Sequence, residues 1–179
     1  MNQPSLTPSK RLLELFPTLL TPPAQGEDYF FLRFKLFESQ LGLISMEAVK
    51  ETILVEADSI TPIPNMPQAC LGLISSRDEV FPVIDLPFAL GNPEPSRSIR
   101  KYQIIVIDIQ PHLVESKLIG LIVPQVQGVN KFKAVEVSEL PPGSNLNLTT
   151  AVDGVLTLHN ERLWVLNVSK LNQLPSLQQ

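Results

Sequence analysis

One pattern in this sequence occurs twice, and it restricts the possible folds more than any other feature. Residues 71–86 read LGLISSRDEVFPVIDL, two apolar runs around a polar centre, and residues 154–168 read GVLTLHNERLWVLNV in the same manner. Aligned without a gap, Gly72 matches Gly154 at an offset of 82 residues. Self-similarity at a fixed spacing is the signature of repeated structural units. The chain is therefore expected to contain two similar units in tandem.

An earlier pair of segments repeats in the same order. Residues 41–44 read LGLI and residues 119–122 read IGLI, at an offset of 78. Two units built from short strands predict an all-β protein of two similar small five-stranded β-barrel subdomains, since closing each sheet removes exposed edges. We place these subdomains at 28–92 and 100–172, on either side of a Pro-rich break. The simpler explanation, that short apolar strands resemble one another anyway, does not account for the preserved order.

Short apolar runs separated by prolines supply the strands. The chain has 17 prolines, and proline cannot donate a ladder hydrogen bond and breaks helices. Alternating apolar residues over 29–36 (YFFLRFKL) predict a half-buried strand. Further strands are expected at 41–46, in both arms of 71–86, at 101–109, at 118–129 and in both arms of 154–168. Residues 47–55 are expected to be either a strand or a bent continuation of the preceding one. Connectors are expected at 60–67 and 137–147, with one short helical turn within 64–72.

Residues 1–27 form an N-terminal arm outside the repeat. Thr7 is a candidate N-cap and Pro8 suits the first helical position, so a short helix is expected to end before Pro17. One or two helical turns are not stable alone. The arm is therefore expected either to pack on its own domain or to dock on a partner. Residues 173–179 are expected to form a tail.

Composition excludes several classes of function. The formal net charge is −4 and charged residues make up 18 %, with no basic cluster to neutralise phosphates, so we expect no nucleic-acid partner. The single cysteine, Cys70, excludes an internal disulfide and fits a reducing compartment. No run approaches the ~20 apolar residues of a membrane span, and no signal-peptide pattern is present. These features predict a cytoplasmic protein without membrane insertion.

The sequence contains no recognisable catalytic constellation. His112, His159 and Cys70 are too few and too scattered for a zinc site. The eight glycines are dispersed and form no phosphate-binding loop. Asp85 and Asp108 could form an acid pair only if the fold brought them together. We therefore expect no enzymatic activity, no metal and no cofactor.

The polar centres of the two hairpins are expected to be tight turns. Asp78 and Asn160 occupy the same point of each turn, and both residue types tolerate the left-handed backbone conformation. Phe81 and Trp164 follow in the return strands and are expected in the core. Arg77 has no such explanation, because a hairpin tip does not require a cation.

Three motifs resemble the CheW family of chemotaxis coupling proteins, including the PilI-type CheW-like proteins of pilus motility. The family's V-x-E-I element corresponds to 49–52 (VKET), and its I-T-P-V-P-N-x-P connector to 60–67 (ITPIPNMP). Its G-x-I-N-L-R-G-x-x-x-P-V-I-D-L hairpin corresponds to 72–86, and the resemblance extends over roughly 28–172. In the second half, Pro124 stands where the family usually has an acidic residue.

The resemblance implies a non-enzymatic adaptor that couples chemoreceptors to a CheA-type histidine kinase in chemotaxis, phototaxis or pilus-based motility. Its implied partners are the signalling tip of a methyl-accepting chemoreceptor and the kinase's regulatory domain, which has the same fold. The implied receptor-binding residues are Arg77, Val49 and Glu51, and no kinase-binding residue is assigned. Two alternatives remain at this point: a ligand-binding or enzymatic β-barrel protein unrelated to chemotaxis, and a merely solvated Arg77.

Overall fold

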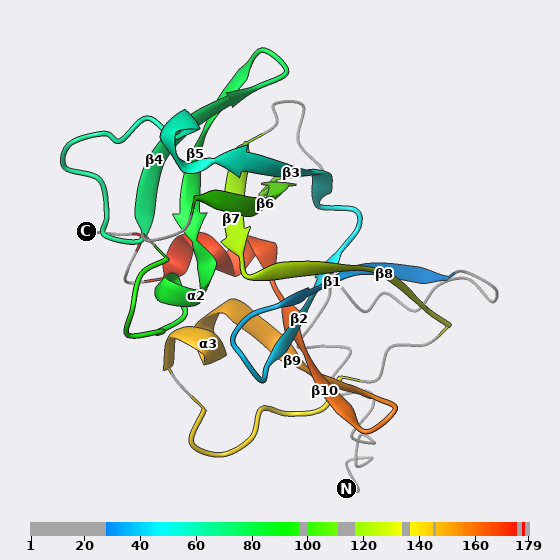
Figure 1. Cartoon of the computed structure of the whole chain (residues 1–179). Coiled ribbons are helices and arrows are strands. Elements are labelled where there is room, and N and C mark those ends of the chain that lie inside the picture. Colours follow the sequence, from blue (N-terminus) through cyan, green and yellow to red (C-terminus); the bar gives the residue numbers. More distant parts are fainter. Residues whose placement is uncertain are drawn as a thin grey trace, which may run out of the picture.

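The computed structural model describes residues 28–96, 100–110, 117–133, 137–144, 146–174 and 177. In this part of the chain, ten strands alternate with short helical elements (Figure 1). The strands are β1 (Tyr29–Lys35), β2 (Leu41–Ser45), β3 (Val49–Glu56), β4 (Cys70–Ser76), β5 (Glu79–Asp85), β6 (Lys101–Asp108), β7 (Leu118–Val123), β8 (Gln125–Phe132), β9 (Val152–Leu158) and β10 (Glu161–Leu166). The helical elements are η1 (Ala57–Ser59), α2 (Leu86–Ala89), α3 (Leu146–Ala151) and η2 (Val168–Gln173). The arm predicted over 1–27, with its helix, and His112 lie outside the described residues.

The strands form two five-stranded sheets, which confirms the predicted fold class. Sheet A has the order β8-β1-β2-β10-β9, and sheet B has the order β3-β6-β7-β5-β4. The same pairings recur in both: β1 with β2 and β6 with β7 are antiparallel, whereas β2 with β10 and β7 with β5 are parallel. The second sheet therefore repeats the first, as the duplicated sequence predicts.

The division into subdomains 28–92 and 100–172 was wrong, because each sheet takes strands from both halves. Sheet A combines β1 and β2 with β8, β9 and β10, and sheet B combines β3, β4 and β5 with β6 and β7. Each repeat thus leaves its own sheet after its second strand and continues in the other. The repeat in the sequence correctly predicts the order of the strands. It does not show whether a strand pairs within its own repeat or with strands of the other repeat.

Pro124 marks one of the two crossing points between the sheets. The predicted single strand over 118–129 is divided there: β7 ends at Val123 in sheet B, and β8 begins at Gln125 in sheet A. Proline offers no N–H to a ladder, so the pairing of β7 cannot continue through this position. The backbone N–H of Val126 instead donates to Gln103 Oε1 of β6 at 2.6 Å, which holds the start of β8 against sheet B.

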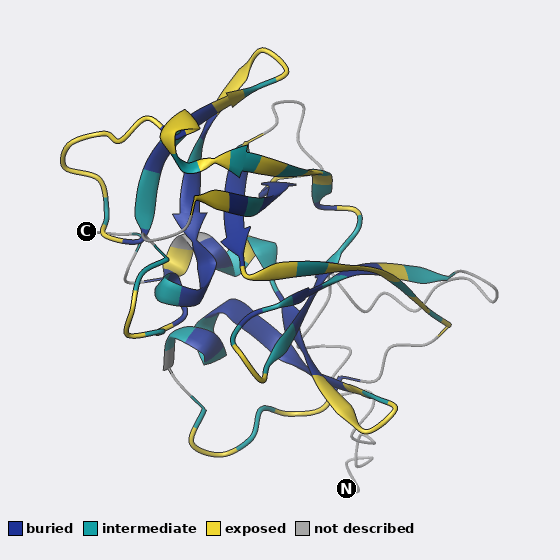
Figure 2. Cartoon of the chain, in the orientation of Figure 1, coloured by how far each residue is buried: buried dark blue, intermediate teal, exposed yellow. Residues whose placement is uncertain are grey.

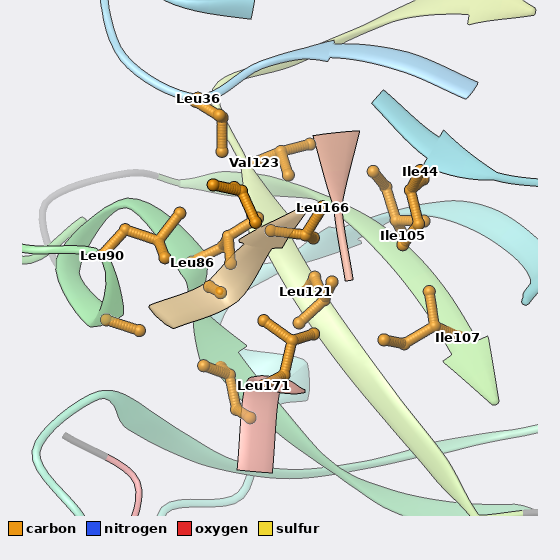
Figure 3. Packing of buried hydrophobic residues seen from close by; sticks show 14 of the residues in the cluster. Leu36, Ile44, Leu86, Leu90, Ile105, Ile107, Leu121, Val123, Leu166 and Leu171 are labelled. Atoms are coloured by element: carbon orange, nitrogen blue, oxygen red, sulfur yellow. The ribbon is translucent and has the colours of Figure 1, made fainter. Parts of the chain in front are cut away.

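Buried apolar side chains form three clusters, one in each sheet and one between the sheets. Each sheet curls and buries the side chains of its inner face. Phe81 and Ile104 are buried in this way in sheet B, and Phe31 and Leu163 in sheet A. The opposite faces pack together with α2, α3 and η2 in a larger cluster, part of which Figure 3 shows. Strands such as β6 are therefore buried on both faces, as the dark blue segments of Figure 2 show. A buried Leu or Ile side chain stabilises the fold by about 1.5–3 kcal/mol.

The matched glycines of the repeat are required by a close backbone approach. Gly72 has φ +147° and Gly154 has φ +156°, a region that favours glycine. A Cβ atom at Gly72 would overlap the carbonyl of Thr61, and one at Gly154 would lie 2.6 Å from Ser138 O. In both cases a connector crosses the strand and exchanges two backbone hydrogen bonds with the residue that follows the glycine.

The helical elements differ from the prediction. The turn expected within 64–72 is not helical, because its prolines and the left-handed Asn65 (φ 61°) give two separate bends. The short helix α2 was not expected; it follows β5, and the Asp85 side chain accepts a hydrogen bond from Phe88 N at 3.2 Å to cap it. Among the described residues, no helix is both long and apolar enough to cross a membrane.

Candidate functional site

The two hairpin tips have nearly the same backbone geometry. Arg77 and Asp78 have φ of 48° and 66°, and His159 and Asn160 have φ of 48° and 70°. Two consecutive residues with positive φ between paired strands are the pattern of a type I′ turn, whose twist matches that of the strands. The expectation of tight turns at both centres is confirmed. The left-handed conformation extends to Arg77, a residue type that seldom adopts it.

The structure brings two of the three predicted site residues together. Arg77 Nε lies 3.0 Å from Glu51 Oε2, and the hydroxyl of Ser76 donates to Glu51 Oε1 at 2.8 Å. Glu51 belongs to β3 and Ser76 to β4, the opposite edge strands of sheet B, so these contacts close the sheet into a barrel at this end. Arg77 thus makes this ion pair with a residue of another strand rather than with its neighbour in sequence, Asp78.

Exposure separates the roles of the two charged residues. The Glu51 side chain is only 16 % exposed, and its carboxylate is held by two donors at the barrel end. The Arg77 side chain is 80 % exposed although its Nε is paired. The pair therefore leaves most of a guanidinium in solvent at the tip of a projecting hairpin, which appears yellow in Figure 2.

Val49 and Glu51 point to opposite faces of β3, because a β-bulge lies between them. The β3–β6 register shifts between Val49 and Glu51: Val49 is opposite Ile107, and Glu51 is opposite Val106. One extra residue in a strand reverses which face the next side chain occupies. Val49 accordingly packs against the cluster between the sheets, whereas Ile53 and Val55, which follow Glu51 in β3, pack inside sheet B.

An apolar surface that the sequence did not reveal adjoins Val49. Phe30 of β1 lies opposite Lys131 of β8, and Phe30 O accepts a hydrogen bond from Met46 N at the end of β2. The next pair with side chains on the same side of the sheet is Leu32 and Val129, and Leu32 belongs to the buried cluster between the sheets.

We call Phe30, Met46, Val129 and Lys131 the three-strand face, because they lie on one side of β1, β2 and β8. Phe30 is 48 % exposed and Val129 is 54 % exposed. The Lys131 ammonium lies 5.8 Å from the centroid of the Phe30 ring. Val49 borders this face, since its N–H bonds to Met46 O at 3.3 Å. The face therefore continues the buried core outward to solvent.

Comparison with known proteins decides the family. The family model of the CheW-like domain matches residues 31–176. The chain belongs to the CheW family. Protein FrzA of Myxococcus xanthus is 26 % identical over 155 residues, which cover 86 % of this chain and 91 % of FrzA. The scaffolding protein TtCheW from Thermoanaerobacter tengcongensis has a TM-score of 0.67 at 24 % identity, covering 86 % of this chain and 98 % of TtCheW. This structural likeness supports the two-sheet fold.

The second barrel of this CheW-like domain ends in a related polar cluster. Arg33 of β1 donates from Nε to Gln127 Oε1 at 2.8 Å, and its second guanidinium nitrogen lies 2.8 Å from Glu161 Oε2. Here the arginine lies within the sheet and is only 20 % exposed, whereas the hairpin tip carries His159. The two hairpin tips are thus alike in backbone but differ in the side chain that each presents, arginine in one and histidine in the other.

The buried carboxylates have structural partners. Asp85 caps α2 and accepts a second hydrogen bond from Ser96 N, and Asp108 accepts from the backbone N–H groups of Gln110 and Lys117. Asp153 accepts two hydrogen bonds from Asn167 and pairs with Lys170 at 2.8 Å. Asp108 also lies 3.5 Å from Lys50 Nζ of β3, so each of the three carboxylates has a structural partner.

The other candidate residues also have structural surroundings. Phe81 and Trp164 are buried core residues, as predicted. Cys70 is partly buried and lines a hollow of about 420 Å³ beneath the connector. A hydrogen bond from Lys101 to Glu56, together with the attraction between their charges, raises the pKa of Lys101. Within the described residues, no group of His, Cys, Asp and Glu side chains could hold a metal ion.

Proposed function

We propose that this CheW-like domain is a non-enzymatic cytoplasmic adaptor that couples chemoreceptors to a CheA-type histidine kinase. The observation that carries the proposal is the pairing of Arg77 with Glu51 at an exposed hairpin tip. These two positions come from separate motifs of the family pattern, and they meet only in the folded chain. The relative TtCheW, described as a scaffolding protein, supports a role in assembly.

The receptor contact is proposed to combine a charged anchor with an apolar surface. Arg77 offers donors to a polar group or a carboxylate of the receptor tip, and Glu51 restricts its position. Val49 borders the three-strand face, where exposed Phe30 and Val129 can bury area against a helix. Large exposed apolar side chains grouped on one surface are typical of sites that bind other proteins.

The kinase contact is proposed to involve the ends and loops of the barrels, which would meet the kinase's regulatory domain of the same fold. No single residue is assigned to it. Pro124, which takes the place of the family's acidic residue, lies at the crossing between β7 and β8 and is exposed. This position is a candidate for partner choice, because a charge at a contact surface affects specificity more than affinity.

The alternative of a ligand-binding or enzymatic barrel has less support. Such a site needs a cavity with a few convergent polar groups. The inner faces of both sheets are instead occupied by apolar side chains, including Phe81 and Val106 in sheet B and Phe31 and Leu156 in sheet A.

The experiment is an assembly assay with the full chain, a receptor signalling-tip fragment and a CheA-type regulatory domain. We expect each fragment to bind with a Kd below ~100 μM, equivalent to about −5.5 kcal/mol, and both to bind at once in one complex. Binding of neither fragment at that concentration contradicts the proposal, and mutually exclusive binding contradicts the coupling role.

A further inference from the structure

Both places where the chain crosses between the sheets are tied to the same strand, β6. The first crossing, residues 46–48 between β2 and β3, is held at the end of β6, where Asp108 N donates to Ala48 O at 2.8 Å. The second crossing is Pro124, between β7 and β8. It is held near the start of β6, where Gln103 Oε1 accepts from Val126 N at 2.6 Å. These two hydrogen bonds lie about 17 Å apart along the strand. β6 therefore anchors both connections between the sheets at two separated points.

The two hydrogen bonds differ in what they depend on. The bond at Asp108 joins two backbone atoms, so it does not require a particular side chain. The bond at Val126 is accepted by the side chain of Gln103. Because the donor is a backbone N–H, the carboxamide must present its oxygen here. A change of one side chain can therefore release the second crossing and leave the first intact.

Gln103 lies on the face of β6 that turns toward sheet A. Ile104 packs inside sheet B, whereas Ile105 packs in the cluster between the sheets. Alternate side chains of a strand share a face, so Gln103 lies on the same side as Ile105. Val126 packs against that cluster from β8. The hydrogen bond thus adds a directional contact to an apolar cluster whose own attraction is non-directional.

The proposed receptor-binding surface is divided between the two sheets. Arg77 projects between β4 and β5 of sheet B, whereas Phe30 and Val129 lie on β1 and β8 of sheet A. β8 carries Val129 about 13 Å beyond Gln125, where the strand begins, so a rotation of only about 10° at the crossing moves Val129 by about 2 Å relative to Arg77. The hydrogen bond at Val126 restricts this rotation where it would start.

We propose that Gln103 is a positioning residue, whose side chain fixes the angle between the two sheets and with it the separation of Arg77 from the three-strand face. It acts through Val126 and the start of β8 rather than by touching a partner. Asn147 Nδ2 of α3 also donates to Ala89 O of α2 at 3.2 Å, so the layer between the sheets keeps a hydrogen bond of its own when Gln103 is changed. Loss of the Gln103 bond therefore alters the angle without separating the sheets.

One consequence rests on the proposed function. A receptor tip that engages Arg77 and the three-strand face together binds only the arrangement in which their separation is correct. If loss of the Gln103 bond leaves that arrangement populated for about one-tenth of the time, the apparent affinity falls roughly ten-fold. The angle itself does not depend on the receptor and can be measured without it.

The experiment measures the distance between two spin labels on the full chain. Cys70→Ala removes the natural cysteine, and Val80→Cys and Val129→Cys place one label on each sheet at exposed positions (66 % and 54 %). The distance distribution of this parent chain is compared with those of three variants made in it. Gln103→Met has a similar shape but lacks the carbonyl acceptor, and Gln103→Glu offers a carboxylate that can accept the same bond. Gln125→Met is the matched control, because it makes the same substitution at an exposed position beside the crossing.

We expect the distribution in Gln103→Met to shift or broaden by about 2 Å, and those in Gln103→Glu and Gln125→Met to match the parent. An unchanged distribution in Gln103→Met overturns the proposal, and so does an equal change in Gln125→Met or a failure of Gln103→Glu to match the parent. If Gln103→Met does not fold, as judged by urea unfolding, Gln103→Asn takes its place in the same comparison. That variant keeps the amide but is one carbon shorter.

A receptor titration separates this proposal from the proposed function. It uses chains with the natural Val80 and Val129, and we expect Gln103→Met to bind a receptor signalling-tip fragment roughly ten-fold more weakly and Gln103→Glu to restore binding. A changed distance without weaker binding leaves the positioning role intact and contradicts only the receptor's contact with both sheets. Absence of receptor binding by the natural chain contradicts the proposed function, and the distance measurement still decides the role of Gln103.

Discussion

Replacing Arg77 tests whether this residue contacts a binding partner or stabilises the fold. Its ion pair joins Nε to Glu51 Oε2 at 3.0 Å, but the arginine side chain is 80 % exposed, so solvent screens the attraction. Exposed pairs contribute about 0–1 kcal/mol to stability. In Arg77→Ala the Glu51 carboxylate keeps its hydrogen bond from Ser76. We therefore expect the free energy of unfolding to fall by less than about 1 kcal/mol and the Tm by no more than about 4 °C.

Binding should respond far more strongly than stability. Arg77→Glu places a second carboxylate beside Glu51 and removes the donors proposed to meet the receptor. Reversing one partner of a desolvated polar contact costs about 2–5 kcal/mol, which weakens binding by roughly 30-fold or more. The assays are urea unfolding and titration with a receptor signalling-tip fragment at fixed salt. Arg162→Glu, an exposed charge reversal on β10, is the matched control and should change neither quantity appreciably.

Two results would refute this reasoning. A loss of about 3 kcal/mol or more in Arg77→Ala would show that the residue holds the turn or the barrel end rather than a partner. Unchanged receptor binding by Arg77→Glu would leave Arg77 as a solvated turn residue, and its pair with Glu51 would no longer support the proposed function.

Two further expectations concern the fold. Gly72→Ala should destabilise the chain by about 3 kcal/mol or more in urea unfolding, because the overlap of the new Cβ atom with Thr61 adds to the strain of a positive φ. Gly128→Ala, at φ +125° but in open space, should cost about 1–2 kcal/mol. Equal costs would contradict the close approach of the connector to Gly72. Separate fragments 1–96 and 97–179 should not fold alone but should form one complex when mixed, since each sheet needs both; a cooperative melt of either fragment alone would disprove this.

Local features of the fold were predictable from the sequence because local chemistry determines them. The tight turns at Asp78 and Asn160 and the alternation in β1 follow from backbone sterics and the period of a strand. The matched glycines were visible as a repeat, although the reason for them was not, because the backbone that crosses Gly72 comes from a connector about ten residues earlier.

Features that depend on distant pairing could not be predicted. Glu51 meets Arg77 only because sheet B curls until its opposite edges touch, and no pattern within either motif indicates that curl. The bulge after Val49 reverses a face without a glycine to announce it. The three-strand face also escaped prediction, because Phe30 reads as an ordinary strand residue until its neighbours on β2 and β8 are known.

The exchange of strands between the repeats also sets the order in which a nascent chain can fold. Sheet B is complete once β7 has been synthesised, but the paired strands β1 and β2 lack their other neighbours until β8 and β10 emerge. At 5–20 residues per second, the ribosome takes about 4–16 s to travel from the end of β2 to the start of β8. During that interval the apolar hairpin of β1 and β2 has neither its sheet nor its core. Its apolar side chains and free strand edges then need protection from aggregation, by chaperones or by rapid completion of synthesis.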